Sequence, residues 1–213
     1  VHALRLALPT TLMLDGLDAD VARAFAHALD LLRAAGALIE DLPLTPLAEL
    51  AGLQANGGFT AAESWAWHRS RMALLETDYD PRVAQRIRRG EAISAADYID
   101  LLQARSSWIS RVRAELQGFD AVLAPTVPMV APVIAPLLSS DSRFFAINGM
   151  LLRNPSVVNM LDGCALSIPC HQPGQMPVGL MIWGSAMADD VVLGVGLAIE
   201  AALAADDAPN GGR

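Results

Sequence analysis

The start of the chain contains two apolar segments separated by one amphipathic helix, and this order constrains the fold more than any other feature. The apolar segments are LRLALP at residues 4–9 and ALIEDLPL at residues 37–44. Between them, Asp18 is placed to cap a helix that Gly36 ends. The apolar face of this helix comprises Val21, Phe25, Leu29 and Leu32. Because two strands joined through a helix pair in parallel by a right-handed crossover, the pattern predicts a βαβ-like unit.

The middle of the chain, residues 45–118, is predicted to be mostly helical. Ala-rich segments cover residues 46–76, and DPRVAQRIRRG forms a short helix that ends at Gly90. Ser94 and Asp97 have the spacing of a capping box at the start of a longer helix. The apolar stripe of this longer helix comprises Tyr98, Leu101, Leu102, Ile109, Val112 and Leu116.

Arg105 lies inside that apolar stripe. A buried guanidinium needs a partner, because an uncompensated charge away from water is costly. We therefore expect Arg105 either to form a structural ion pair or to hold a ligand carboxylate or phosphate.

A proline-rich apolar segment, GFDAVLAPTVPMVAPVIAPL, follows the helical region at residues 118–137. Its DAVLAP portion is typical of a short strand. The prolines that follow remove amide donors and force extended backbone, so the rest of the segment is predicted to be a loop outside the sheet. Long apolar loops of this kind line a cleft or pack over the edge of a core.

The last part of the chain alternates between helices and strands. A short helix is expected at residues 142–152, followed by the loop RNPSVVNMLDG, the strands CALSIPC and PVGLMIWG, and a closing helix at residues 189–205. Helices interleaved with strands indicate the α/β class, with a mixed β-sheet flanked by helices. We predict one α/β domain over residues 1–213, with a flexible tail at residues 206–213.

Charge argues against a nucleic-acid partner. The 213 residues carry a formal net charge of −8, and all 15 basic residues are arginine. This balance repels phosphate backbones. The basic residues are scattered except for one group, which comprises Arg82, Arg86, Arg88 and Arg89. We interpret the group as a solvated helix face, with a ligand-facing role for one member as the alternative.

The sequence also argues against a membrane protein, a disulfide and a metal site. Pro, Gly or charged residues interrupt every apolar run before the roughly 20 residues that a membrane span needs, and the start does not resemble a signal peptide. We therefore expect a cytoplasmic protein. Cys164 and Cys170 lie in one predicted strand, roughly 20 Å apart, which is beyond disulfide reach. The four histidines are isolated, so we expect no metal and no cofactor.

Familiar nucleophile patterns are missing. No G-x-S-x-G motif occurs. Ser167, Asp162 and His171 are close in sequence, but we expect Ser167 to be a packed strand residue rather than part of a triad. Cys170 is adjacent to His171, yet neighbouring strand residues point to opposite faces, which argues against an activated thiolate.

Two long segments resemble the amidase signature family. One runs from YDPRVAQRIRRG to DAVLAPTVPMVAP, and the other is RNPSVVNMLDGCALSIPCHQPGQMPVGLMIWG followed by DDVVLGVGLAIEAAL. The combination of an aspartate-strand-P-T-x-P loop with N-x-x-x-G, S-x-P-C and P-V-G-L is specific. The resemblance extends over nearly the whole chain and corresponds to the C-terminal half of these enzymes.

The resemblance implies hydrolysis of carboxylic amides by a serine nucleophile, a second serine and a lysine base. In the family these three belong to a Gly/Ser-rich region that precedes the matched part. This sequence has neither a G-G-S-S-G-G stretch nor a lysine. We therefore expect no catalytic residue in this chain, no activity from it alone, and a missing N-terminal half that supplies the chemistry.

The same resemblance implies a set of substrate-binding residues on one cleft wall. The set comprises Arg86, Pro125, Thr126, Asn154 and Asn159. Helix or turn capping is the alternative for the two asparagines, and a solvated surface for Arg86. The sequence departs from the family pattern at Cys164, where proline is usual, and at His171, where glycine is common.

Three hypotheses for function remain open. The first is the C-terminal portion of an amidase whose complete form takes a small-molecule amide. The second is a fragment of the amidase subunit of the glutamyl-tRNA amidotransferase. The third is a non-catalytic domain that binds small molecules. Loss of an N-terminal half would expose an apolar face, so a homo-oligomer is a possible state of the isolated chain.

Overall fold

The computed structural model describes residues 1–207, which form two compact units. One unit comprises Val1–Leu47 and the chain from Val112 onward, and the other comprises Ala48–Arg111. The expectation that both behave as one domain stays a prediction. Of the tail predicted at residues 206–213, the part from residue 208 onward lies outside the described residues, whereas residues 206 and 207 close the last helix.

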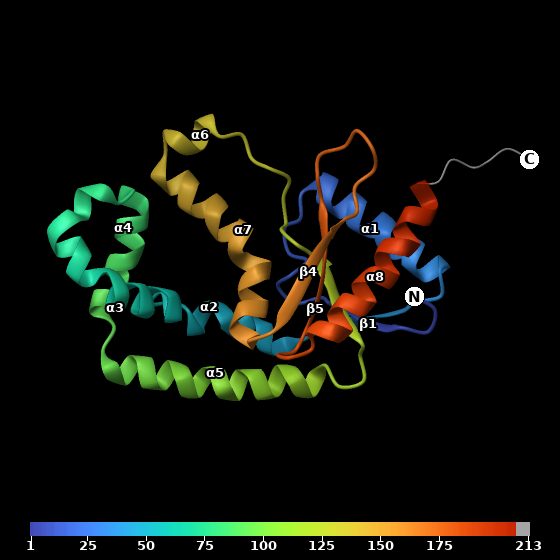
Figure 1. Cartoon of the computed structure of the whole chain (residues 1–213), viewed down its shortest axis with the longest axis horizontal. Helices are drawn as coiled ribbons and strands as arrows, with labels where there is room; N and C mark the ends of the chain where they lie inside the picture. Colours follow the sequence, from blue (N-terminus) through green and yellow to red (C-terminus); the bar gives the residue numbers. More distant parts are fainter. Residues whose placement is uncertain (208–213) are drawn as a thin grey trace, which may run out of the picture. The chain divides into compact units, whose positions relative to one another are not determined.

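The first unit contains a mixed five-stranded sheet (Figure 1). Its strands are β1 (Arg5–Pro9), β2 (Leu38–Leu42), β3 (Ala121–Pro125), β4 (Cys164–Pro169) and β5 (Gly179–Gly184), in the order β2-β1-β3-β5-β4. The β1 strand pairs in parallel with β2 and β3, whereas β5 runs antiparallel to β3 and β4. The predicted α/β class and mixed sheet are therefore confirmed.

Helices α1 (Ala19–Ala34) and α8 (Asp189–Asp207) share one hydrophobic core with the sheet (Figure 1). The predicted apolar face of α1 is buried in this core, as are Leu6, Leu123, Leu180 and Ile182 from the strands. Strand residues that alternate with these, such as Ala7 and Val122, are also buried. Both faces of the central strands are therefore covered.

The predicted loop RNPSVVNMLDG is wrong, because helix α7 (Asp141–Leu161) continues through Pro155. A proline inside a helix removes one amide donor and disfavours helical backbone at the residue before it, which is why a helix end was expected here. In the structure, Asn154 is fully buried and hydrogen-bonded through its side chain, and Val157 and Leu161 are fully buried in the next turns. Tertiary contacts therefore outweigh the local preference. The short helix α6 (Ala135–Leu138) precedes α7.

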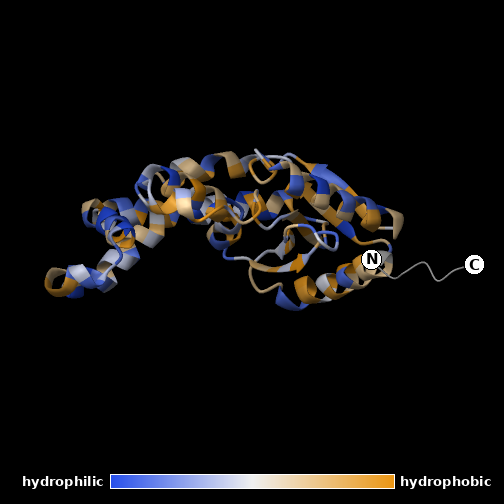
Figure 2. Ribbon diagram, turned by 90° about the horizontal axis from the view of Figure 1, so that it is seen from above, coloured by the Kyte–Doolittle hydropathy of each residue, from blue (hydrophilic) through white to orange (hydrophobic). Residues whose placement is uncertain are grey.

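The second unit is helical, as predicted. It contains α2 (Leu50–Leu53), α3 (Gly58–Leu75), η2 (Glu76–Asp78), α4 (Pro81–Arg88), η3 (Arg89–Ala92) and most of α5 (Ala95–Glu115). Ser94 Oγ accepts from the Asp97 amide while the Asp97 carboxylate accepts from the Ser94 amide, so the capping box is confirmed. The apolar stripe of α5 is only partly buried, since Val112 and Leu116 are buried but Leu102 is 46% exposed. Figure 2 shows hydrophobic and hydrophilic residues along most helices, as amphipathic packing requires.

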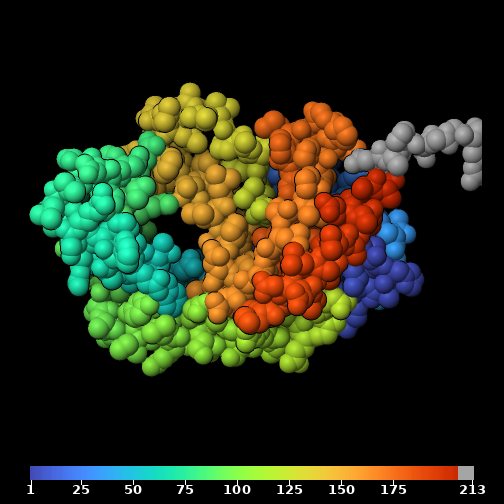
Figure 3. All heavy atoms as spheres, in the orientation of Figure 1, coloured from blue at the N-terminus to red at the C-terminus, as the bar shows by residue number. Residues whose placement is uncertain are grey.

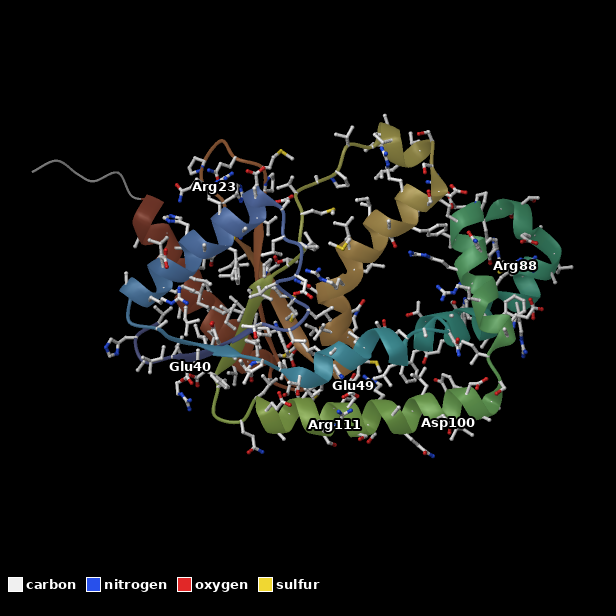
Figure 4. The ribbon with its side chains drawn as sticks, turned by 180° about the vertical axis from the view of Figure 1, so that it is seen from behind. Arg23, Glu40, Glu49, Arg88, Asp100 and Arg111 are labelled. Atoms are coloured by element: carbon white, nitrogen blue, oxygen red, sulfur yellow. The ribbon has the colours of Figure 1, made fainter. Side chains whose placement is uncertain are left out.

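Charged side chains connect the helices of the second unit. Arg111 donates two hydrogen bonds to the Glu49 carboxylate, one of them 2.6 Å long, and the two side chains point toward one another in Figure 4. These hydrogen bonds hold the pKa of Glu49 below its ordinary value. The Arg105 guanidinium lies over the Phe59 ring, 5.6 Å from its centre, so a cation–π contact is part of its environment.

The group of four arginines is more than a solvated face. Arg88 donates from Nε to Glu76 at 2.8 Å, and Arg89 donates from Nη2 to the Ala55 carbonyl at 3.1 Å. The first of these contacts holds the pKa of Glu76 below its ordinary value. At least these two arginines therefore fix α4 and η3 to neighbouring segments.

Candidate functional site

Strand β3 ends in a small cluster of hydroxyl groups. The Thr126 hydroxyl lies 2.5 Å from the Ser167 hydroxyl of β4, and the Thr126 amide donates to the Gly179 carbonyl at 2.8 Å. A Cβ atom on Gly179 would lie 2.4 Å from the Ser167 oxygen and 2.6 Å from the Thr126 oxygen. Only glycine therefore fits beneath this pair of hydroxyls, which can each donate or accept a hydrogen bond.

Asn154 of α7 joins two distant segments of backbone at the same place. Its Nδ2 donates to the Pro125 carbonyl at 2.7 Å and to the Met13 carbonyl at 3.0 Å. Its Oδ1 accepts from Arg153 Nε at 3.1 Å, and Arg153 also donates to the Asp15 carbonyl at 2.6 Å. Both amide donors of this buried side chain are used within the protein. We infer that Asn154 positions the loop rather than contacting a ligand directly.

Asp18 fixes the other end of the same loop. Its Oδ1 accepts from the Val21 amide at 2.8 Å and caps α1, as predicted. Its Oδ2 accepts from the Val130 amide at 2.8 Å, and its own amide donates to the Pro128 carbonyl at 2.9 Å. The loop after β3 is thus held between the start of α1 and the middle of α7. The sequence indicated the cap but gave no sign of the contact with residue 130.

Substitution of Asp18 should separate its two roles. Asp18→Asn keeps an acceptor for the helix cap but turns an NH₂ group toward the Val130 amide, so it should cost about 1–2 kcal/mol and leave α1 capped. Asp18→Ala removes both acceptors and should cost roughly 1 kcal/mol more. Urea unfolding gives the stabilities, and amide hydrogen exchange at Val130 reports on the loop. Equal exchange at Val130 in wild type and Asp18→Asn would contradict the assigned contact.

The predicted substrate residues fall into separate places. Pro125, Thr126 and Asn154 lie together at the end of β3. Asn159 is exposed on α7, on a face of the helix that differs from that of the buried Asn154. Arg86 is a half-buried residue of α4 in the second unit. Within the first unit, the structure therefore brings together Pro125, Thr126 and Asn154 but not Asn159. Asp18, Arg153 and Ser167 were missed as parts of the site, because their contacts join segments far apart in sequence.

Ser167 and His171 do not act on one another as nucleophile and base. Ser167 Oγ is bonded to Thr126, and His171 Nδ1 accepts from the Val178 amide at 3.3 Å. Burial raises the pKa of the Cys170 thiol to about 11. Burial also raises the pKa of the Cys164 thiol, and the Asp189 carboxylate adds to the effect. The thiols are therefore poor nucleophiles near neutral pH.

Alkylation rates test this assignment. At pH 8 a thiol with a pKa of about 11 holds about one thiolate per thousand molecules, so native Cys170 should react with iodoacetamide very slowly. Peptide mass spectrometry should show Cys164 modified before Cys170 in native protein, and both modified at similar rates in urea. A Cys170 that reacts faster in the folded protein than in urea would indicate an activated thiol and contradict this conclusion.

Metal binding and membrane insertion find no support in the described part of the chain. Among residues 1–207, no group of three or more His, Cys, Asp or Glu side chains is arranged to hold a metal ion. In that same stretch, no helix is both long enough and apolar enough to traverse a bilayer.

Comparison with known proteins identifies the family. The family model described as Amidase matches residues 2–193. The chain belongs to the amidase signature family. The resemblance that the sequence motifs indicated is therefore confirmed.

Curated relatives of this amidase chain differ in their reactions. It is 34% identical over 233 residues to indoleacetamide hydrolase of Rhizobium radiobacter, a match that covers 95% of this chain and 47% of that protein. It is 30% identical over 207 residues to 2-amino-5-chloromuconic acid deaminase of Comamonas testosteroni, covering 95% and 44%. It is 28% identical over 225 residues to a glutamyl-tRNA(Gln) amidotransferase subunit of Acidobacterium capsulatum, covering 94% and 46%. The chain thus spans less than half the length of these relatives.

Solved amidase structures share the fold. One crystal structure of an amidase matches with a TM-score of 0.78 at 24% identity, covering 94% of this chain and 46% of that one. The allophanate hydrolase of Kluyveromyces lactis matches with a TM-score of 0.78 at 24% identity, covering 90% and 31%.

Proposed function

We propose that this chain is the C-terminal portion of an enzyme that hydrolyses small carboxylic amides, and that it is inactive alone. One observation carries the proposal: an amidase family chain that contains no lysine cannot supply the lysine base that the resemblance implies. The hydroxyl pair of Thr126 and Ser167 offers no substitute, because its members hydrogen-bond to one another and His171 hydrogen-bonds to the backbone of Val178.

In the complete enzyme, the loop at Pro125 and Thr126 forms one wall of the substrate cleft. A wall of this kind supplies apolar surface and a few polar groups that orient an amide, while the serine and the base come from elsewhere. Thr126 can donate to or accept from the substrate without a change of charge. Asn154 and Asp18 keep the loop in place. Contributions from Asn159 and Arg86 remain predictions.

The substrate class rests on the relatives. The names indoleacetamide hydrolase and 2-amino-5-chloromuconic acid deaminase both describe reactions of small molecules. Both proteins are at least 30% identical to this chain. We propose that the substrate is a small-molecule amide rather than an aminoacylated transfer RNA. The net charge of −8 supports this choice, because it opposes contact with a phosphate backbone.

An ammonia-release assay tests the proposal. The 213-residue chain, incubated with indole-3-acetamide or benzamide, should release no ammonia above the rate without protein. The gene upstream is expected to encode, in the same frame, a Gly/Ser-rich segment with two serines and a lysine, and the joined polypeptide should release ammonia. Turnover by the chain alone that is lost in Ser167→Ala would overturn the proposal.

Thr126→Val in the joined polypeptide should raise KM more than it lowers kcat.

A further inference from the structure

Strand β4 forms an open edge of the sheet in the first unit. In the order β2-β1-β3-β5-β4, no strand of the described residues follows β4. Backbone groups of an antiparallel strand point alternately toward its partner and away from it. The Cys170 amide donates to the Val178 carbonyl at 3.0 Å, so the even-numbered residues of β4 face β5. Ala165 and Ser167 therefore direct their N–H and C=O groups away from the sheet, and both residues are exposed.

The two edges of this sheet differ in charge. At the opposite edge, β2 carries the exposed carboxylates Glu40 and Asp41, and charged side chains protect an edge strand from pairing with another chain. Strand β4, with the sequence CALSIP, carries no charge. Its last residue, Pro169, lacks an amide donor, but the residues before it can all pair. Of the two edges, β4 is therefore the one that can pair with a copy of itself without opposing like charges.

Helix α8 places exposed apolar side chains next to the β4 edge. A Cβ atom on Gly196 of α8 would lie 2.5 Å from Leu166 Cδ2 of β4, so the helix packs directly on this strand. Leu193 and Leu197 lie within one helical turn of Gly196 and are 55% and 69% exposed, and Figure 3 shows α8 at the surface. A partner that only added a strand would leave these leucines in water. A second copy of the chain would bring its own α8 to them.

We propose that the β4 edge binds the β4 edge of a second copy of the 213-residue chain, in antiparallel orientation. A two-fold axis at Leu166 pairs Ala165 of each copy with Ser167 of the other, and each pair exchanges both of its backbone hydrogen bonds. An axis at Ser167 would instead pair Ala165 with Pro169, which has no N–H to donate. The first register is therefore favoured.

The same axis brings the two copies of α8 together. It is perpendicular to the joined sheet, so both helices lie on one face of that sheet. Neighbouring strands are about 4.8 Å apart, and packed helices are about 8–10 Å apart. Because each α8 packs on its own β4, the two helices reach packing distance. Contact between them buries Leu193 and Leu197, which adds the apolar area that two short strands alone do not supply.

Amide hydrogen exchange at two protein concentrations tests the interface. Analytical ultracentrifugation should show a dimer at about 500 µM that dissociates on dilution to about 5 µM. At the higher concentration, the Ala165 and Ser167 amides should exchange roughly tenfold more slowly than after dilution. The Leu166 and Ile168 amides face β5, so they should be protected equally at both concentrations.

Matched variants locate the interface. Ala165→Glu places a charge on the edge, whereas Ala26→Glu makes the same change at an exposed position of α1. The first should be monomeric at about 500 µM, and the second should dimerise as the wild type does. Ala165→Pro removes one outward N–H without disturbing the hydrogen bonds to β5, so it should also be monomeric and keep its fold by circular dichroism.

Three results would overturn the proposal. The first is a chain that stays monomeric, or that forms assemblies larger than a dimer. The second is protection of the Ala165 and Ser167 amides that does not change with concentration, as expected if a segment of the same chain covers the edge. The third is a dimer that persists in both Ala165 variants, which would place the interface elsewhere. None of these results bears on amide hydrolysis, which the ammonia assay measures separately.

Discussion

Asn154→Leu should lower the free energy of unfolding by about 2–4 kcal/mol. The side chain is 0% exposed, donates to the Pro125 and Met13 carbonyls and accepts from Arg153 Nε, so leucine of similar size removes three hydrogen bonds without leaving a large void. The Pro125 and Met13 carbonyls would lose their donor, so the free-energy cost of removing them from water would no longer be offset by a hydrogen bond. Urea unfolding followed by circular dichroism measures the loss, and hydrogen exchange near residue 13 should show a loosened segment.

Asn154→Asp should make the stability deficit depend on pH, which a packing defect alone would not do. Its carboxylate would keep one hydrogen bond from Arg153 Nε but would face two carbonyl oxygens in a fully buried position, so desolvation and these carbonyls should raise the pKa of the new side chain above its unfolded value. A group with a raised folded pKa binds its proton more tightly in the native state, so the deficit in stability relative to wild type should grow as pH rises from 4 to 7. Asn159→Ala, at an exposed position on the same helix, should change stability by less than about 0.5 kcal/mol at either pH.

Little or no loss in Asn154→Leu would show that the two hydrogen bonds do not hold the loop. A pH-independent deficit in Asn154→Asp would mean that the new carboxylate is solvated, and would contradict the buried position.

The order of strands and helices was predictable because local patterns determine it. Alternation, capping residues and glycine stops indicated β1, α1 and β2, and the Ser94–Asp97 box indicated the start of α5. Sheet order was not accessible in this way, since pairing of β3 with β5 joins residues far apart in sequence. The error at Pro155 has the same origin, because the contacts that keep α7 continuous come from Met13 and Pro125.

The candidate site was predictable only in part, for a related reason. The resemblance indicated Pro125, Thr126 and Asn154, which the structure places together. The residue pattern placed Asn154 and Asn159 in one predicted loop, whereas five positions of helix turn them to different faces. Nothing in the local sequence, in which Asn154 precedes Pro155, indicated that the Asn154 side chain would be fully buried.

Gly90→Ala should be the most damaging single-methyl change in the helical unit, with a loss of about 3 kcal/mol or more. A Cβ atom at this buried position would lie 2.0 Å from the Ala61 carbonyl oxygen and 2.6 Å from Trp65 Cβ. The nearest obstacle is backbone of α3, which cannot move aside as a flexible side chain would. The sequence indicated only that Gly90 stops a helix, whereas the structure shows that η3 approaches α3 too closely for any side chain.

Gly52→Ala in the same unit is the matched control. Apart from its chain neighbours and the backbone of its own helix, nothing lies within 4 Å of a Cβ atom built at Gly52, so alanine at this helical position should stabilise the protein by up to about 1 kcal/mol. Because a chain with two compact units need not unfold in one step, amide hydrogen exchange in α3 is a better measurement than a single unfolding curve. Protection of α3 should fall sharply in Gly90→Ala and stay unchanged in Gly52→Ala. Equal protection in the two variants would mean that η3 and α3 do not approach one another as closely as these distances require.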